Sequence, residues 1–546
     1  MAKLVIPENQ MAASILMCLV ILIGGKTIST TGITKLLGIT AELLLGVSIY
    51  RLIFHPLAQY PGPWLAAVTD WYSVYHCLLG DRHLDFLRLH QVYGPAVRFG
   101  PNRVSFCTDQ AVQDIYGIRA NTQKSQVYRA FSHFFSVPAS LTTIDRKTHG
   151  FKRRVTSSAL TTAAVKSLEE PILKNVRVLC MSLSESAART VEGEWSASHN
   201  MSKEVQFLLS DIMGDVTFSK NWSIQASPDN RHILDLMSLG TSGIHLAGHI
   251  PTILTLKLDQ ICFPNLTKGV QEFFQLSEAQ SMWRVAQDSA LLPNRDLFAA
   301  LLDARDPETE KGYSQQDLIA EAGILIIAGA DTTATATTAT IFYLLHSEDA
   351  YTRVRAEVDS AFMRDQNSDV EAIRIGRKLS SCLFLYSCIN EAMRLSPPVG
   401  GLLPREVLAG GLDVDGGRYH VPAGMDVGVP TYALHHTQEY WPNPHEFQPE
   451  RWLNGSSAEQ KAAFIPFGAG RTACVGKYLA YQEIGIIVAR LLWLFDIRLA
   501  PDSSAAQSKE VPFWEPSWGR QRKGEFQMRD VFTSTHDGPS LQFRRR

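Results

Sequence analysis

Residues 464–476, which read Phe-Ile-Pro-Phe-Gly-Ala-Gly-Arg-Thr-Ala-Cys-Val-Gly, constrain this chain more than any other segment. Cys474 follows a glycine-rich turn, and a stretch with helical periodicity begins directly after it. Glycines let the backbone pass close to a flat ligand and turn amide hydrogens toward the sulfur. The positive end of the following helix favours a thiolate, which can serve as the axial ligand of haem iron. A lone buried cysteine is more often structural, so the surrounding pattern has to decide between the two interpretations.

The spacing Phe467-x-x-Gly470-x-x-x-Cys474-x-Gly476 resembles the haem-binding loop of the cytochrome P450 family. Three further motifs of that family lie upstream in the expected order, so the resemblance covers nearly the whole chain after residue 55. It implies the cytochrome P450 fold, which is mainly α with small β-sheets. It also implies haem b as the cofactor, with Cys474 as the metal ligand and Phe467, Gly470 and Gly476 in the cofactor-binding loop.

One position of this loop departs from the family pattern. The family usually places an arginine two residues before the cysteine, where this chain has Thr472, and the arginine is Arg471 instead. Threonine is too short to form an ion pair with a haem propionate. Arg471 either swings inward through an altered turn or faces solvent toward the electron donor. A one-residue shift on a constrained loop usually redirects the side chain, which favours the second alternative.

A second motif lies in an apolar run between Glu321 and Glu348, where Asp331 is the single Asp, Glu, Lys or Arg. The run contains six threonines between Thr332 and Thr340, and polar groups in lipid need partners. A long helix buried through the middle of a domain therefore fits better than a transmembrane helix.

The centre of this run, Ala-Gly-Ala-Asp-Thr-Thr at residues 328–333, is similar to the oxygen-activation motif of the family. The resemblance implies catalytic roles for three residues. Gly329 would leave room for dioxygen, Thr332 would donate a hydrogen bond toward it, and Asp331 would relay protons from solvent. The alternative is a threonine hydroxyl that bonds its own preceding turn, but this does not explain a lone acid in an apolar helix.

A third motif is Glu391-Ala-Met-Arg394, which places opposite charges three residues apart on one helix face. As an isolated pair it would be a surface salt bridge that contributes little to stability. Phe-Gln-Pro-Glu-Arg-Trp at residues 447–452 follows some fifty residues later. The resemblance implies that Glu391, Arg394 and Arg451 form a buried structural triad beneath the haem loop.

Haem carries two propionates, which need cationic partners. The pattern His149-x-x-x-Arg153 matches a family helix whose arginine holds a propionate, and Arg405 and His435 match two further positions of this kind. Arg153 and Arg405 are expected to be the main anchors. For His435 the alternative is a solvated loop histidine. Residues 146–154 carry five positive charges and, with Arg471 and Lys477, are expected to form the docking face of an acidic electron donor.

The N-terminal segment differs from the rest of the chain. Residues 9–25 carry no charge, and a second apolar stretch at 36–54 is interrupted by Glu42 and Arg51. We expect a membrane anchor over residues 1–54, with one or two spans, rather than a buried helix pair. The first stretch lacks a small-residue cleavage site, which argues against a removed signal peptide.

The three prolines in residues 55–63 predict a rigid hinge, and residues 64–546 form the expected catalytic domain. Lys26 and Lys35 follow the first apolar stretch and place this domain on the cytosolic side. The expected location is therefore the endoplasmic reticulum membrane. The eight scattered cysteines indicate that the catalytic domain lies in a reduced compartment.

Within the catalytic domain the sequence predicts strand hairpins at 96–106 and 412–422, and amphipathic helices at 160–190, 204–219 and 346–364. A net charge of −2 gives no indication of nucleic-acid binding, and no nucleic-acid-binding fold motif accompanies the basic run.

Substrate contacts are expected from residues 121–141, from the helix before Ala328, from residues 399–403 and from the segment near Phe513. These segments are largely apolar or aromatic, which favours a hydrophobic small-molecule substrate. The chain after Cys474 is too short for a flavin or nicotinamide domain, so electrons are expected from NADPH through a separate cytochrome P450 reductase.

The resemblance implies a haem-thiolate monooxygenase that inserts one atom of dioxygen into its substrate, and the chain as a whole is similar to fungal members from secondary metabolism. Two alternatives remain. One is a haem-thiolate isomerase or dehydratase that needs no reductase, against which the pair Asp331 and Thr332 argues. The other is a membrane haem protein without turnover.

Overall fold

The computed structural model describes residues 30–546 except 190–193, 293–294, 365–368, 502–517, 521 and 523. Helices predominate in these residues. They are α2 Thr30–Ile49, α3 Trp64–Val68, α4 Trp71–Leu79, α5 Arg82–Tyr93, α6 Asp109–Tyr116, α7 Arg129–Phe135, α8 Arg146–Ala159, α9 Thr162–Ser167, α10 Glu169–Ala188, α11 Met201–Phe218, α12 His232–His249, α13 Pro251–Thr255, α14 Asp259–Cys262, α15 Pro264–Val285, α16 Leu297–Asp303, α17 Gln315–Leu345, α18 Glu348–Ala361, α19 Arg377–Ser380, α20 Leu383–Leu395, α21 Thr431–His435, α22 Ala458–Ala463 and α23 Lys477–Leu494.

The strands are short and form small sheets. They are β1 Ala96–Gly100, β2 Arg103–Phe106, β3 Thr122–Lys124, β4 His199–Asn200, β5 Arg405–Val407, β6 Leu412–Val414, β7 Tyr419–Val421, β8 Asp426–Gly428, β9 Phe495–Leu499, β10 Arg529–Val531, β11 Thr533–Thr535 and β12 Ser540–Arg545. The largest sheet has the order β1-β2-β8-β5-β3, in which β2 and β8 are parallel. Both expected hairpins are present, because β1 pairs with β2 and β6 pairs with β7 in antiparallel register.

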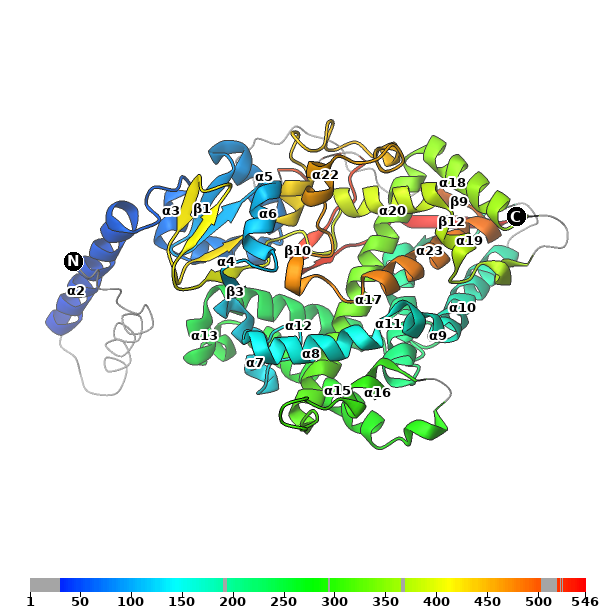
Figure 1. The fold of residues 1–546 in the computed structure, drawn as a ribbon, viewed down its shortest axis with the longest axis horizontal. Coiled ribbons are helices and arrows are strands. Elements are labelled where there is room, and N and C mark those ends of the chain that lie inside the picture. The colour runs from blue at the N-terminus through cyan, green and yellow to red at the C-terminus, as the bar shows by residue number, and fades with distance from the viewer. Residues whose placement is uncertain are drawn as a thin grey trace.

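The long helix α17 lies in the middle of the molecule and packs against α11, α15, α20 and α23 (Figure 1). Ser314 and Asp317 form a reciprocal capping box at its N-terminus, which satisfies two backbone N–H groups that the helix leaves unpaired. Most of its residues from Leu318 onward are buried in the main hydrophobic core. The expected buried helix at the centre of the domain is therefore present.

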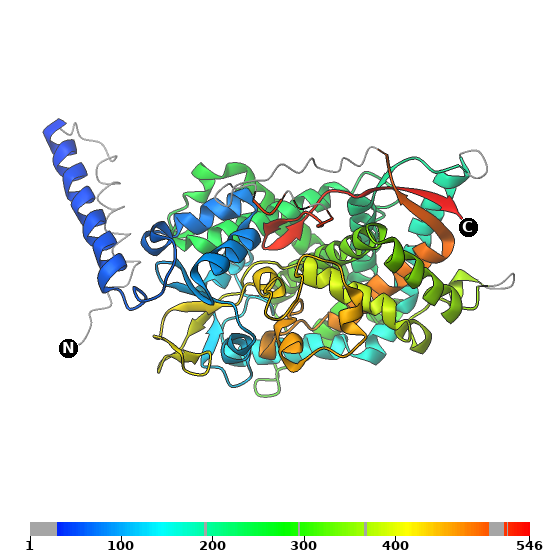
Figure 2. The same ribbon diagram turned by 90° about the horizontal axis from the view of Figure 1, so that it is seen from above.

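The N-terminal helix α2 projects away from the body of the molecule, as Figure 2 shows. Its second half exposes large apolar side chains, among them Leu44 and Leu45, which are 54% and 62% exposed. The chain then runs through a π-helical turn, Tyr50–Phe54, and residues 55–63 follow without helix. Part of this proline-rich segment packs on β1, since the N–H of Arg98 donates to the carbonyl of Pro61 at 2.8 Å.

Among the helices in the described residues, α17 alone is long and apolar enough to cross a membrane, and two thirds of it is buried inside the protein. The first expected anchor stretch, residues 9–25, lies outside the described residues, as does Lys26. The expected anchor over residues 1–54 therefore stays a prediction.

Candidate active site

Cys474 is held by a tight loop between α22 and α23. The backbone N–H of Cys474 donates to the carbonyl of Phe467 at 2.7 Å. Gly468 and Gly470 have φ angles of 66° and 61°, in the left-handed region that favours glycine. At Gly470 a Cβ atom would lie 1.8 Å from the carbonyl oxygen of Tyr116, so a side chain does not fit there. This close approach fixes the loop against the end of α6.

Cys474 lies below the outer surface of the protein, and its exposed area lines a cavity. Burial raises the pKa of this thiol, and the N–H groups of Gly476 and Lys477 and the charge of Arg153 partly oppose the shift. These N–H groups lie at the start of α23, for which Gly476 is the N-cap. A metal ion bound to the sulfur would instead lower the pKa of this thiol, because a coordinating thiol is deprotonated outright.

The cavity has a volume of about 320 Å³ and lies between the cysteine loop and α17. Phe467, Cys474 and Gly476 line it from the loop. Gly329 and Thr332 line it from α17. The structure thus brings the predicted metal ligand and the predicted oxygen-activation motif to one cavity, although more than a hundred residues separate them in the sequence.

On α17, the Thr332 hydroxyl donates to the carbonyl of Ala328 at 2.7 Å. This is the bond to the preceding turn that the sequence offered as an alternative, and it coexists with exposure of the side chain to the cavity. A Cβ atom at Gly329 would lie 2.3 Å from Met213 Sδ on α11. The absence of a side chain at this position therefore also lets α17 pack closely on α11.

Asp331 lies behind the cavity wall rather than in it. Burial raises the pKa of its carboxyl to about 6, while the side chains of Thr533 and Gln206 beside it partly oppose the shift. Thr533 itself lines the cavity. The Thr533 hydroxyl oxygen is buried and has no hydrogen-bond partner among the described groups. An acid that titrates near neutral pH beside such a hydroxyl is suited to passing protons between the protein and the site.

Basic side chains gather at one end of the cavity: Lys124, His149, Arg153 and Arg405 all line it. Arg153 Nη1 donates to the carbonyl of Ala473 at 2.7 Å, and Lys124 Nζ donates to the carbonyl of Leu141 at 2.6 Å. Burial and, to a smaller extent, the neighbouring cations lower the pKa of Lys124 to about 7 and that of His149 to about 4.

These residues fit a haem group. The cavity offers one thiol, on a loop from which Phe467, Gly468 and Gly476 also line it, and this matches the axial ligand of a flat macrocycle. Gly470, expected in the same loop, does not line the cavity and instead packs against the carbonyl of Tyr116. Among the described residues, none of Lys124, Arg153 and Arg405 forms an ion pair with a carboxylate within 4.0 Å. Cations grouped without counter-ions around a cavity need an anionic ligand, and the two propionates of haem would supply it.

Thr472, which stands where the family usually has an arginine, is hydrogen-bonded to Arg405. Arg405 is 5% exposed, and its Nη2 donates to Thr472 Oγ1 at 2.6 Å. Arg471 is exposed, does not line the large cavity, and donates through Nε to the carbonyl of Ile118 at 2.6 Å. The threonine thus orients an arginine that comes from β5, while the displaced arginine lies on the outside of the loop.

The expected role of His435 needs correction. It is fully buried and does not line the cavity. Its Nε2 accepts from the N–H of Ile465 at 3.0 Å, and its Nδ1 lies 3.2 Å from the carbonyl oxygen of Arg394. Since both ring nitrogens are engaged by the backbone, His435 supports the start of the cysteine loop instead of contacting a propionate.

The expected triad is assembled on α20. Arg394 forms two hydrogen bonds to Glu391, at 2.9 and 2.8 Å, and both side chains are fully buried. Arg451 Nε lies 3.3 Å from Glu391 Oε1, and Trp452 Nε1 donates to Glu391 Oε2 at 3.0 Å. Arg394 also donates to the carbonyl of His435 at 2.8 Å, which ties the triad to the residue that supports the loop.

Among the cavity residues to which the sequence analysis gave no individual role, three are polar and lie close to the proposed chemistry. Lys124 and Thr533 are described above, and Glu483 lines the cavity from α23, where burial raises its pKa to about 8. Their sequence surroundings carry no motif, and they reach the cavity only through tertiary packing. From the segments expected to contact substrate, Tyr128, Phe131 and Val399 do line the cavity, whereas Phe513 lies outside the described residues.

Comparison with known proteins agrees with this site. The family model described as Cytochrome P450 matches residues 61–517. The chain is 37% identical over 514 residues to Cytochrome P450 monooxygenase poxM of Penicillium oxalicum, covering 94% of this chain and 95% of that protein. It is 36% identical over 526 residues to Cytochrome P450 monooxygenase AKT7 of Alternaria alternata, covering 93% and 97%.

A solved structure shares the fold. The crystal structure of cytochrome P450DA heme domain superposes with a TM-score of 0.67, at 18% identity, and covers 89% of this chain and 98% of that chain. With a cysteine loop, a threonine-bearing central helix and a buried Glu–Arg–Arg triad in place, the chain belongs to the cytochrome P450 family.

Proposed function

We propose that this protein is a membrane-anchored haem-thiolate monooxygenase. It would insert one atom of dioxygen into a largely apolar small molecule, with electrons from NADPH that arrive through a separate cytochrome P450 reductase. The observation that carries the proposal is that Cys474 and Thr332 face the same cavity, with Asp331 and its raised pKa directly behind it. An acid–threonine pair next to a thiolate ligand serves proton delivery, which a peroxide isomerase or dehydratase does not need.

Haem bound through Cys474 would supply the chemistry of oxygen activation. The chain's own residues position and protect that chemistry. Arg153 and Arg405 would hold the two propionates, and Thr472 fixes the direction of Arg405. Asp331 would supply protons toward the Thr332 hydroxyl, which donates to the carbonyl of Ala328 in this structure and would turn toward an oxygen atom bound in the cavity.

The walls of the cavity support an apolar substrate. Phe131, Phe135 and Phe273 contribute aromatic surface, and Ile324 and Leu325 line it from α17. Largely apolar walls exclude water and hold an apolar molecule by burial, while the basic side chains gather at one end of the cavity. The relatives poxM and AKT7 are named as monooxygenases, which agrees with this reaction class.

The electron donor is proposed to dock on the side of the cysteine loop. Arg471 and Lys477 are exposed there. In the basic run of α8, Lys152 is buried and Arg153 faces the cavity, so a smaller part of that run than expected remains for an acidic partner. Steering by exposed charges weakens with salt, because the screening length falls to ~8 Å at physiological ionic strength.

The N-terminal segment is proposed to anchor the protein in the endoplasmic reticulum membrane, with the catalytic domain in the cytosol. The exposed apolar side chains along α2 and its projection from the body support this assignment (Figure 2). Asn200, Asn221, Asn265 and Asn454 begin glycosylation acceptor sequences. They should stay unmodified in microsomes, and a mobility shift on glycosidase treatment would place the domain in the lumen.

The reaction class is tested with ¹⁸O₂. Purified full chain, reductase and NADPH are incubated with a panel of apolar small molecules, and products are analysed by mass spectrometry. A monooxygenase yields products with one labelled atom only when NADPH and reductase are both present. Product formation without reductase would favour the isomerase or dehydratase alternative. Substrate-induced spectral change without NADPH consumption for any panel member would favour the non-catalytic haem protein.

A further inference from the structure

A second cavity, of about 30 Å³, lies against the active-site cavity. Both are lined by the same five residues, namely Tyr128, Phe131, Val399, Leu403 and Phe532. Most of the surface of the small cavity is apolar, as it is in the large one. Its wall also carries five ionisable side chains, namely Arg82, Arg103, His245, His249 and Asp530.

Arg82 is the least satisfied of these side chains. It is 2% exposed, and neither Nη1 nor Nη2 has a hydrogen-bond partner within the described part of the protein. Its ion pair with Asp85 spans 3.8 Å, whereas Arg88 reaches the same carboxylate at 2.7 Å. The ring of Phe86, 4.4 Å from the Arg82 guanidinium carbon, holds the group in place. A buried guanidinium with two unpaired nitrogens is costly, so it indicates an oxygen-bearing partner.

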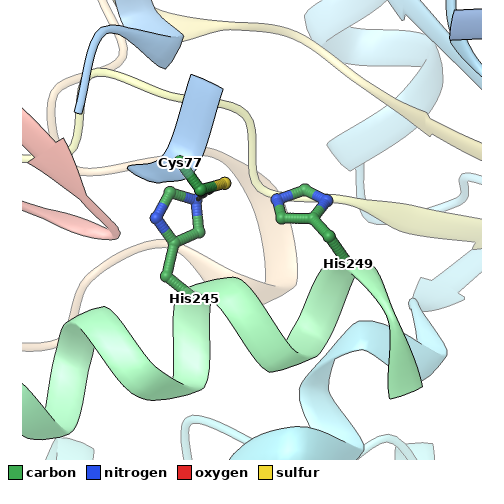
Figure 3. Close-up of side chains that lie close together, drawn as sticks. All are labelled: Cys77, His245 and His249. Carbon is green, nitrogen blue, oxygen red and sulfur yellow. Dashed lines mark hydrogen bonds between the residues drawn. The ribbon is translucent and has the colours of Figure 1, made fainter. Parts of the chain in front are cut away.

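The neighbouring histidines could at first suggest a metal site. His245 and His249 rise from one helix, α12, and the Cys77 sulfur lies beside the His245 ring (Figure 3). However, Arg103 Nη1 lies 2.7 Å from His249 Nδ1, and burial together with the charge of Arg82 lowers the pKa of His245 to about 3. The weakly paired charge of Arg82 opposes a cation here and favours an anion instead.

His245 can add a donor to this wall. Cys77 Sγ lies 3.6 Å from His245 Nε2, and burial raises the pKa of the thiol to about 12, so the sulfur keeps its proton. A thiol that donates to Nε2 leaves the hydrogen of the neutral imidazole on Nδ1. Arg82 and His245 then present hydrogen-bond donors to the same small cavity.

Asp530 contributes an acidic group to the same cavity. It is 2% exposed, and its Oδ2 has no hydrogen-bond partner among the described groups. Burial raises the pKa of Asp530 to about 7, and the charge of Arg82 partly opposes this. A protonated Asp530 can donate to a second oxygen of an anion that Arg82 holds. The remaining charge on this wall, Arg103, is already paired with Asp70 at 3.4 Å and Asp426 at 3.8 Å.

We propose that the small cavity is a subsite for a carboxylate at one end of the substrate, held by the Arg82 guanidinium while the apolar remainder occupies the large cavity. The planar fork of arginine matches a carboxylate, and the volume suits one such group. Arg82 lines only the small cavity and Cys474 only the large one, so the acidic end lies away from the position of oxidation. This inference rests on the proposed function, of which it specifies the substrate class.

The test uses haem-loaded full-length protein and substrate-type difference spectra, with dodecanoate, dodecanamide and 1-dodecanol as probes. Dodecanoate should bind at least tenfold more tightly than the two neutral probes, and Arg82→Gln should abolish that preference while leaving dodecanamide binding unchanged. Arg88→Gln is the matched control, because Arg88 pairs with the same Asp85 but does not line the cavity. It should keep the preference.

Two further measurements test whether the Arg82 cavity binds the carboxylate. Asp530→Asn removes an acid but can still accept the N–H of Phe532, and it should tighten dodecanoate binding a few-fold. Acetate alone should give no spectral change, yet at high concentration it should compete with dodecanoate if the subsite takes any small carboxylate. Equal binding of dodecanoate and dodecanamide, or a preference that survives Arg82→Gln, would mean that water fills the cavity and the inference is wrong. These spectra need no reductase, so they can fail while the ¹⁸O₂ experiment succeeds, and the reverse.

Discussion

The pair Arg405 and Arg471 tests which arginine anchors the cofactor. Arg405 is buried, lines the cavity and is oriented by Thr472, whereas Arg471 is exposed and bonded to the carbonyl of Ile118. We expect Arg405→Ala to weaken haem retention strongly and Arg471→Ala to leave it nearly unchanged. The two variants remove the same charge and differ only in where that charge points.

The magnitude follows from the bond that each variant removes. A hydrogen bond to a charged group contributes about 1.5–3 kcal/mol, which corresponds to a rise of about 10- to 150-fold in the haem dissociation constant for Arg405→Ala. An exposed arginine contributes about 0–1 kcal/mol, so Arg471→Ala should change this constant less than about fivefold. Thr472→Val should fall between the two variants, because it keeps the Arg405 charge but removes the bond that orients it.

The assay follows transfer of haem from each variant to excess apomyoglobin at the Soret band, at low and at physiological salt. Reduction by the flavoprotein is measured in parallel and should be slowed by Arg471→Ala, most clearly at low salt. If Arg471→Ala loses haem as readily as Arg405→Ala, the displaced arginine points inward in the loaded protein. That result would refute the reasoning from the Thr472 bond.

Four further variants test the remaining parts of the site. Cys474→Ser should abolish the red-shifted Soret band of the reduced carbon-monoxide complex, and survival of that band would exclude Cys474 as the iron ligand. Thr332→Ala should retain haem and NADPH oxidation but divert oxygen to peroxide, and unchanged coupling of NADPH to product would exclude its role in proton delivery. Because burial raises the Asp331 pKa from 3.8 to about 6, the folded state binds this proton more tightly and loses stability as pH rises from about 4 to about 6. Asp331→Asn should therefore gain thermal stability relative to the parent at pH 7.5 but not at pH 4, and a pH-independent difference would contradict the assignment. Glu391→Ala should destabilise the fold by about 3–5 kcal/mol in denaturant unfolding, because it leaves the buried Arg394 unpaired, and a loss below about 1 kcal/mol would mean that the triad is not needed.

Elements that depend on a local pattern could be predicted before the fold was known. The glycine spacing before Cys474, the charge-poor run around Asp331 and the i, i+3 pair Glu391 and Arg394 are local signals, and each occupies the place that the pattern predicted. The hairpins β1–β2 and β6–β7 follow from turn residues between short apolar strands. Family membership also followed from these motifs, because their order and spacing are legible without any contact between them.

The tertiary structure alone decided which side chains face the cavity. His435 was expected at a propionate but points into the backbone of the cysteine loop, whereas Lys124 enters the basic end from β3 without any motif. For Arg471 the sequence left two directions open, and the fold places it outside the cavity. Gly470 is required because the carbonyl of Tyr116 passes 1.8 Å from where its Cβ would be, a contact across the fold. The subsite of Arg82 likewise depends on contacts between elements that are distant in the chain.

The physical reason is that side-chain direction depends on packing between elements that are distant in the chain. Periodicity tells which face of a helix is apolar, but it does not tell which partner lies opposite each residue. Arg82 belongs to a helix whose buried face carries charged residues, and only the approach of α12 and β10 turns that face into a cavity wall. The local sequence therefore predicts the metal ligand Cys474 and its loop. Packing between distant elements determines which side chains line the cavities beside it.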